Sequence, residues 1–245
     1  MSNRLGILSL SALVSALSVS ASPAYAADGC TPLKLDFGQA TVAWAHLPLA
    51  KLKRDTVYTL ADDNGQKVLH AEANSSASLY GTRLKSPIAA PAALSWRWKT
   101  DALVAGADNR DKTREDAPLR VIVAFDGDKT SLPETELKQM KRARMLSGRE
   151  PPYATLIYVW SEQVPVDTVI PSAHTGQLKM IVAASGANGL GTWQSVRRNV
   201  AEDYQRAFGK PPGRVIGVGV MTDTDNTGNK ASGDYADLRV SCAAK

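Results

Sequence analysis

The sequence predicts an all-β protein, a jelly-roll-like sandwich of two antiparallel sheets interrupted by one or two short helices. The main observation is a series of short β-branched or aromatic runs separated by Gly, Pro, Asn and Asp. Ten such runs occur, and this many strands in one domain favours two packed sheets. We expect the strands near residues 57–60, 67–73, 78–83, 93–100, 119–125, 154–161, 177–184, 192–200, 214–221 and 235–241.

Two segments interrupt the strand pattern and predict helices. The first covers residues 133–146, with Pro133 at an N1-like position, and the second covers residues 201–208, just before Gly209. The first helix carries four basic residues, which we interpret as a solvated face: Lys138, Lys141, Arg142 and Arg144.

The N-terminal residues have the pattern of a cleavable export signal. Arg4 is followed by an apolar stretch over residues 5–19, too short for a membrane anchor, and then by the small-x-small motif Ala24-Tyr25-Ala26. We therefore expect a signal peptide over residues 1–26 and a single β-sandwich domain over residues 27–245. The expected location is periplasmic or secreted, without a transmembrane anchor.

Export permits disulfide formation, and the chain has two cysteines, Cys30 and Cys242. We expect these residues to pair and to close most of the mature chain into one ring. The loop-entropy model gives such a ring about 5 kcal/mol of stabilisation. Lipid attachment at Cys30 is disfavoured, because Ala27-Asp28-Gly29 lacks the usual aliphatic residue.

The formal net charge of +5 limits the expected partners. Basic residues are spread along the chain and no nucleic-acid-binding motif occurs, so nucleic acid is not an expected partner. Outside the cytoplasm, a modest positive charge favours acidic glycans or anionic envelope surfaces. We expect a monomer.

Strict alternation along the strands assigns each side chain to one of two faces. The expected core face is apolar and consists of Leu94, Trp96, Trp98, Val121, Val123, Phe125, Leu156, Tyr158, Trp160, Ala236, Leu238 and Val240. The opposite face is rich in polar and aromatic groups and consists of Arg97, Lys99, Arg120, Asp126, Trp193, Arg197, Asn199, Tyr235, Asp237 and Arg239.

Two glycines and a charged stretch accompany this polar face. Gly217 and Gly219 leave one side of their strand without side-chain cover, which allows a ligand or another backbone to approach closely. Either a shallow groove lies over them, or a loop or the first helix covers them. We interpret residues 108–116 as a solvated loop whose end, with Glu115 and Asp116, lies at the rim of such a groove.

Residues 222–228 form the densest polar stretch and have the oxygen spacing of a calcium loop. Asp223, Asp225, Thr227 and Asp234 fall at its first, third, fifth and twelfth positions, which makes Ca²⁺ the candidate cofactor. However, strands flank this loop and the twelfth residue is Asp where Glu is usual. An ordinary turn, or a ligand-binding loop that includes Asn226, therefore remains an alternative.

The chemistry of the polar face suits a glycan or another polar ligand. Arg and Asp would hydrogen-bond hydroxyls or carboxylates, and Trp193 or Tyr235 would stack on a sugar ring. The same groups would also serve as a structural ion-pair network. No catalytic residue is assigned, because the sequence has no Gly-x-Ser-x-Gly, His-x-x-x-His or Cys-x-x-Cys motif.

Several motifs occur together in a specific order: residues 94–99 (LSWRWK), 120–126 (RVIVAFD), 158–160 (YVW), 198–200 (RNV) and 221–227 (MTDTDNT). Over residues 58–240 the chain resembles the bacterial family catalogued as domain of unknown function 3047. The resemblance implies a secreted β-sandwich similar in outline to sugar-binding jelly rolls. It implies no activity and no catalytic residues.

Three functional hypotheses follow. The leading one is non-catalytic binding of a glycan or other polar ligand on the polar face. The second is a glycan-processing hydrolase or lyase that uses the same face, with carboxylates such as Asp223 and Asp225. The third is a structural protein of the cell envelope that binds another envelope protein.

Overall fold

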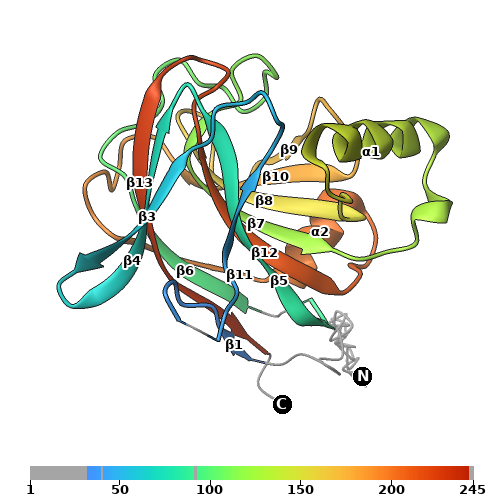
Figure 1. The fold of residues 1–245 in the computed structure, drawn as a ribbon, viewed down its shortest axis with the longest axis horizontal. Helices are drawn as coiled ribbons and strands as arrows, with labels where there is room; N and C mark the ends of the chain where they lie inside the picture. The colour runs from blue at the N-terminus through green and yellow to red at the C-terminus, as the bar shows by residue number, and fades with distance from the viewer. Residues whose placement is uncertain (1–31, 40, 91–92, 243–245) are drawn as a thin grey trace, which may run out of the picture.

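The computed structural model describes residues 32–39, 41–90 and 93–242, which form two packed β-sheets and two α-helices (Figure 1). The predicted signal peptide and Cys30 lie outside the described residues. The predicted disulfide therefore stays a prediction, although Cys242 is described. Within the described residues, no helix is both long enough and apolar enough to cross a membrane.

Sheet A contains six strands in the described part of the chain. Its order is β11 (Gln194–Arg198), β6 (Ala93–Lys99), β13 (Lys230–Ser241), β4 (Gln66–Asn74) and β3 (Val57–Asp63), with β1 (Leu33–Lys34) also paired to β13. All of these pairs are antiparallel.

Sheet B contains seven strands in the described residues. Its order is β2 (Ala45–Pro48), β5 (Ala77–Ile88), β12 (Val215–Asp223), β7 (Ala117–Phe125), β8 (Ala154–Ser161), β10 (Leu178–Ser185) and β9 (Val169–Pro171). The pair β8 and β10 is parallel, unlike every other pair. The connection over residues 162–177 is long enough for this crossover.

The predicted two-sheet sandwich is confirmed, and its core lies between the sheets. All twelve residues of the expected core face are at most 3% exposed. Aromatic rings from both sheets meet there: the Trp98 and Trp160 ring centroids are 6.0 Å apart, and those of Trp96 and Tyr158 are 5.2 Å apart. Alternation thus identified the inward side of β6, β7 and β8 correctly, and that of β13 from Leu238 onward.

The alternation fails at one point on β13. Asp237 has a positive φ of 54° at a register shift between Ala236 and Arg239, which is a β-bulge. The bulge shifts the alternation, so the residues before it point to the opposite side from the one predicted, whereas Leu238, Arg239 and Val240 after it lie as predicted. Tyr235, predicted on the polar face, is instead fully buried opposite Trp98, and its hydroxyl donates to the Met221 carbonyl at 2.7 Å.

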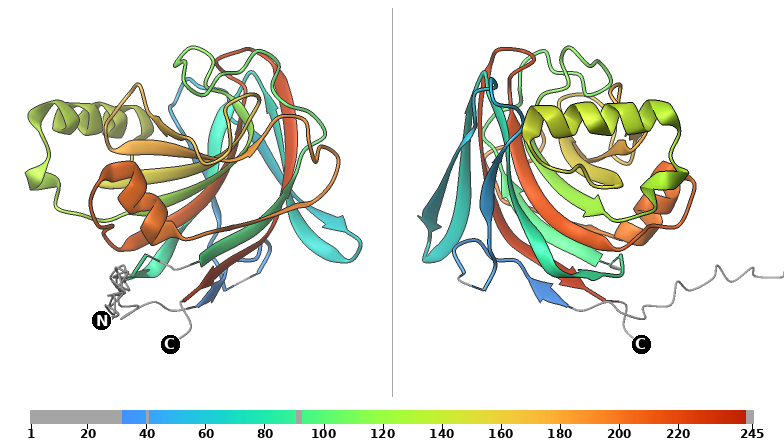
Figure 2. Two further views of the ribbon diagram at one scale, coloured as in Figure 1. Left: turned by 180° about the vertical axis from the view of Figure 1, so that it is seen from behind. Right: turned by 45° about the vertical axis from the view of Figure 1, so that its right-hand side comes forward.

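Both predicted helices occur. Helix α1 (Glu134–Ser147) ends at Gly148 and helix α2 (Val200–Phe208) ends at Gly209, both glycines having a left-handed conformation. A short 3₁₀ turn, η1 (Lys129–Ser131), precedes α1. Figure 2 shows both helices on the sheet B side of the molecule, so neither lies over the outer face of sheet A.

Candidate functional site

The outer face of sheet A carries several of the polar side chains predicted from the sequence, and they are partly exposed. On β6, Arg97 and Lys99 alternate with the core residues Trp96 and Trp98, so the two cations point outward. Their side chains are 29% and 26% exposed. They lie within reach of a ligand on this face.

Trp193 lies just before β11, and its ring contacts both of these cations. Its ring centroid is 4.8 Å from the Arg97 guanidinium carbon and 5.1 Å from the Lys99 Nζ, both cation–π distances. The indole Nε1 donates to the Asp63 Oδ2 at 2.6 Å. We call Trp193, Arg97, Lys99 and Asp63 the Trp193 cluster.

The bulge residue Asp237 extends the cluster along β13. Arg97 Nε donates to the Asp237 Oδ2 at 2.5 Å, and Arg97 Nη2 donates to the Gln66 Oε1 at 2.6 Å. Gln66 Nε2 in turn donates to the Asp237 Oδ1 at 2.8 Å, and Arg239 Nη2 donates to the same oxygen at 3.1 Å. The hydrogen bonds hold the outer-face side chains in one arrangement.

Asp234 belongs to this face and not to the predicted calcium loop. Its Oδ2 lies 3.3 Å from the Lys99 Nζ, and its Oδ1 lies 2.7 Å from the His70 Nδ1. The sequence placed Asp234 at the last calcium position; the structure places it with the Trp193 cluster, because β13 carries it away from the loop before it.

Arg197 shares the outer face of sheet A. It is exposed and pairs in register with Ser95, next to the pair of Ser195 with Arg97. Among the described residues it has no hydrogen-bond or ion-pair partner. This unpaired cation is therefore available to an anionic group of a ligand.

Arg120 and Asp223 are not on this face, which corrects the predicted single surface. They belong to sheet B, and their side chains are each 4% exposed on its far side. Arg120 Nε and Nη2 donate to the two Asp223 oxygens at 2.7 and 3.1 Å. Alternation shows on which side of its strand a residue lies, but not which sheet the strand joins.

Burial governs the chemistry of this pair. It raises the pKa of Asp223 to about 7; Arg120 lowers that pKa, and the carboxylates of Asp116 and Asp225 raise it. A carboxyl with this pKa is a candidate general acid. Here, however, Asp223 is 3% exposed and lies on the opposite side of the sandwich from the Trp193 cluster.

Three carboxylates gather at the end of β12. Ligand atoms of Asp116, Asp223 and Asp225 lie within 4.8 Å of one another. Asp225 pairs with the Lys53 ammonium, and Asp223 pairs with Arg120. A calcium ion would therefore compete with two cations that already pair with two of the three carboxylates.

Asp116 was the residue of this group that the predicted metal set lacked. Its Oδ2 accepts hydrogen bonds from the Thr227 backbone nitrogen and hydroxyl, both at 2.7 Å, and its Oδ1 accepts one from the Asn226 nitrogen at 3.2 Å. Thr227 thus donates to a carboxylate. The signal in the sequence was the position of Asp116 at the end of the charged stretch 108–116.

The remaining predicted site residues have structural positions. Asn199 is the N-cap of α2 and accepts the Glu202 backbone N–H at 3.2 Å. Asp126 follows β7 and accepts the Gly127 N–H at 2.8 Å. Both lie outside the Trp193 cluster.

The predicted groove over Gly217 and Gly219 is filled. Both glycines are buried in the centre of sheet B. A Cβ added to Gly219 would meet the Leu79 side chain at 2.9 Å, so the neighbouring strand β5 supplies the cover. The glycine allows this close packing between strands.

The fold and the outer-face site define an all-β sandwich with a polar, aromatic surface on one sheet. A family model described as "Protein of unknown function (DUF3047)" matches residues 42–239, and the chain belongs to this family. This confirms the resemblance found in the sequence. No significant match occurs among curated protein sequences.

Two solved structures show low similarity to the chain. An agarase crystal structure has a TM-score of 0.35 and 8% identity, over 87% of this chain and 25% of the agarase chain. Endoglucanase 3 of Trichoderma harzianum, from family GH12, has a TM-score of 0.38 and 8% identity, over 82% of this chain and 97% of the other. This chain thus spans a quarter of the agarase.

Proposed function

We propose that this protein binds a glycan without turning it over, and that the Trp193 cluster is the contact surface. The observation that carries the proposal is a partly exposed indole ring flanked by Arg97 and Lys99 on a sheet face that no helix covers. An aromatic ring offers a flat apolar surface for the C–H face of a sugar. The flanking cations and carboxylates would bond its hydroxyl groups.

The hydrogen-bonded arrangement of the site supports this function. Arg97, Gln66 and Asp237 hold one another through three hydrogen bonds, so these groups lose little freedom when a ligand binds. Arg197 adds an unpaired cation on the same face. We therefore infer that acidic glycans bind more tightly than neutral ones.

A glycan array tests the proposal. We expect the protein to retain a subset of acidic polysaccharides, Trp193→Ala to weaken that binding at least tenfold, and Trp193→Phe to keep most of it because the ring remains. Lys141→Gln is a matched surface control, since Lys141 is exposed on α1 on the other side of the molecule. Absence of binding to any acidic or neutral glycan would refute the proposal.

Turnover of the glycan is the rival function, and the raised pKa of Asp223 is the observation in its favour. That carboxyl is buried on the far side of the sandwich, so it does not reach a ligand at the Trp193 cluster. We expect no new reducing ends after long incubation with any glycan that binds. Release of reducing ends by wild type and not by Asp223→Asn would establish the enzyme instead.

Calcium binding remains a prediction, and the carboxylates close enough together to hold the ion are those of Asp116, Asp223 and Asp225. An ion that binds only the folded protein raises its Tm. We therefore propose thermal unfolding of the chelator-treated protein with and without added calcium. A rise in Tm that Asp225→Asn removes would establish the ion, whereas an unchanged Tm would assign the carboxylates to the ion-pair network alone.

Export to the periplasm or the medium is part of the same proposal, since an exported protein has access to the glycans of the cell envelope. The N-terminal sequence pattern supports it. Intact mass of the protein from the periplasmic fraction would reveal cleavage after Ala26. Mass under non-reducing conditions would reveal the Cys30–Cys242 disulfide.

A further inference from the structure

Helix α1 lies across the outer face of sheet B, and hydrogen bonds connect its first turn and a residue beyond its end to other parts of the chain. At its start, the Glu136 carboxylate accepts the Gly176 N–H at 2.9 Å and the Thr175 hydroxyl, from the connection before β10. Beyond its end, Arg149 donates to the Pro48 carbonyl of β2. Because β2 is the first strand in the sheet order and β10 is the last but one, α1 and the turn after it span most of the sheet.

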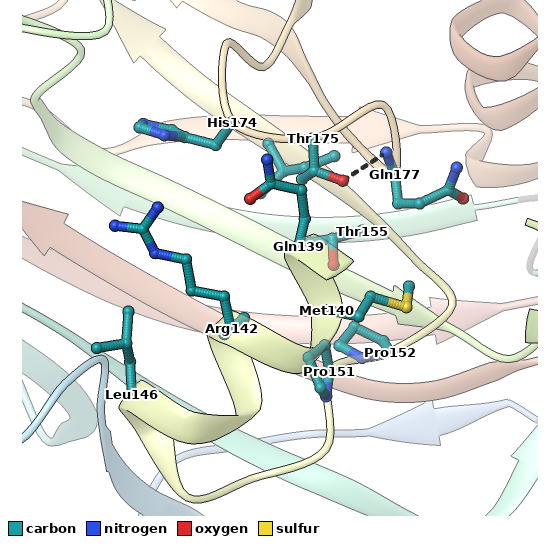
Figure 3. A pocket seen from close by; sticks show the side chains of 12 residues that line it. Gln139, Met140, Arg142, Leu146, Pro151, Pro152, Thr155, His174, Thr175 and Gln177 are labelled. Atoms are coloured by element: carbon teal, nitrogen blue, oxygen red, sulfur yellow. Dashed lines mark hydrogen bonds between the residues drawn. The ribbon is translucent and has the colours of Figure 1, made fainter. Parts of the chain in front are cut away.

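A pocket of about 410 Å³ lies between α1 and the starts of β8 and β10 (Figure 3). This volume is at the lower end of the ~300–1,000 Å³ range typical of small-ligand sites. The helix, the turn after it, β8, the connection before β10 and the start of β10 line it, and the lining includes Met140, Arg142, Leu146, Pro151, His174 and Leu178.

The apolar part of the lining is incompletely covered by the protein. Leu146 remains 51% exposed at the pocket, and Pro151, Pro152 and Leu178 are partly exposed. An apolar chain that covered these surfaces would gain about 25 cal/mol for each Å² removed from water. The pocket therefore favours a ligand with an apolar body.

The polar part of the lining favours an anion at one side of the pocket. Arg142 has no hydrogen-bond or ion-pair partner among the described residues. In Figure 3 its guanidinium and the His174 ring extend to the same side, away from Met140 and Pro152. His174 already pairs with Glu115 at 3.3 Å, so Arg142 is the available charge.

The charge of the helix supports the same choice. Helix α1 has four basic residues, Lys138, Lys141, Arg142 and Arg144, and two acidic ones, Glu134 and Glu136. Glu134 pairs with Lys138, and Glu136 is bonded to the connection before β10. Arg144 pairs with Glu150, so Lys141 and Arg142 are the cations of the helix without a carboxylate partner among the described residues, and the helix has a net charge of +2. This positive charge favours an anion over a cation.

We propose that this pocket binds a small amphiphile with an anionic head, of the class of medium-chain carboxylates. Its chain lies against Met140, Leu146, Pro151 and Leu178, and its carboxylate pairs with Arg142. The site is on the opposite side of the sandwich from the Trp193 cluster and does not depend on glycan binding.

Calorimetric titration of the full mature protein with three probes that share a ten-carbon chain tests this inference: decanoate and decyltrimethylammonium, each below its critical micelle concentration, and decanol below its solubility limit. We expect decanoate to bind with one site per chain, decanol to bind about tenfold more weakly, and the cationic probe not to bind. We expect Arg142→Gln to weaken decanoate binding about tenfold and to leave decanol binding unchanged.

Two further variants make the test specific. Lys141→Gln removes the same charge from the neighbouring helix position, which does not line the pocket, and we expect it to change decanoate affinity less than twofold. Ala143→Trp places a large side chain at an exposed lining position, and we expect it to abolish binding without loss of folding by circular dichroism.

Three results would overturn the inference. They are no decanoate binding to the wild type, equal binding of the cationic probe, and equal loss of affinity in Arg142→Gln and Lys141→Gln. The last would show a general attraction to the basic helix surface and no pocket.

Discussion

Single side chains on the outer face of sheet A carry the proposed recognition. Arg197 is the one whose role is easiest to isolate, because it is exposed and has no partner among the described residues. We expect Arg197→Gln to lower affinity for an acidic glycan several-fold and to leave a neutral glycan unaffected. Titration of both glycans at low and high salt measures this difference, and an equal loss for both would contradict it.

Asp223 gives a second prediction at the residue scale, for the pH dependence of stability. The pKa of its carboxyl is about 7 in the folded protein, and its usual value is 3.8. At a pH between these two values, folding is therefore accompanied by the uptake of a proton. The stabilising contribution is fully present below about pH 4 and is lost as the pH rises through about 7. Stability should therefore fall with rising pH because of this group.

We expect the Asp223→Asn variant to lack this decrease in stability with rising pH. We expect the free energy of unfolding of the wild type to decrease by about 2 kcal/mol more than that of Asp223→Asn between about pH 5.5 and about pH 8.5. Urea unfolding of both proteins at the two pH values gives the comparison. Parallel changes in the two proteins would show that Asp223 does not titrate in this range.

Side-chain directions were predictable from the sequence only where the strand is regular. Period-two alternation placed Arg97, Lys99 and Asp237 outward correctly, since a strand has only two sides. It misplaced Tyr235, because the bulge at Asp237 inserts a residue that no local pattern announces. Asp116 and Asp223 lie close together although they are more than a hundred residues apart in the sequence, which local spacing does not report.

At the scale of elements, Asn199 changes from a ligand candidate to a helix cap. Its side chain accepts the Glu202 N–H at 3.2 Å at the start of α2. We expect Asn199→Ala to cost about 1 kcal/mol of stability and Asn199→Ser to cost much less, because Ser retains the cap. Neither should change glycan affinity. Urea unfolding measures the first effect, and a loss of affinity in both variants would restore a ligand role.

The strands and helices themselves were largely predictable. Apolar runs and turn residues marked all ten longer strands, and Pro133 before the first helix and Gly209 after the second marked both helices. The short strands β1, β2 and β9 were missed, since two to four residues carry no periodicity. The parallel pairing of β8 with β10 depends on the path of the connection between them, which composition does not specify.

At the scale of the whole molecule, the sandwich separates two surfaces of different chemistry. The outer face of sheet A has an aromatic ring among paired charges, and the other side has a basic helix over a partly apolar pocket. The core that divides them is aromatic and closely packed. Because the two sheets pack against each other through this core, their outer faces point in opposite directions. A ligand bound on one surface therefore does not contact the other surface.

The tryptophan indole signals allow ligand binding on the outer face of sheet A to be measured directly. The chain has five, of which Trp96, Trp98 and Trp160 are fully buried in the core and Trp44 packs against it. Trp193 alone lies on the outer face of sheet A, with its indole Nε1–H bonded to Asp63. Each indole gives a separate ¹⁵N–¹H signal, and Trp193→Phe identifies the fifth.

Titration of ¹⁵N-labelled protein with an acidic oligosaccharide selected on the array is therefore the decisive measurement. The account predicts that the Trp193 indole signal moves in a saturable manner while the four core signals stay in place. A bound glycan that leaves the Trp193 signal unmoved would contradict the assignment of this face as the binding surface.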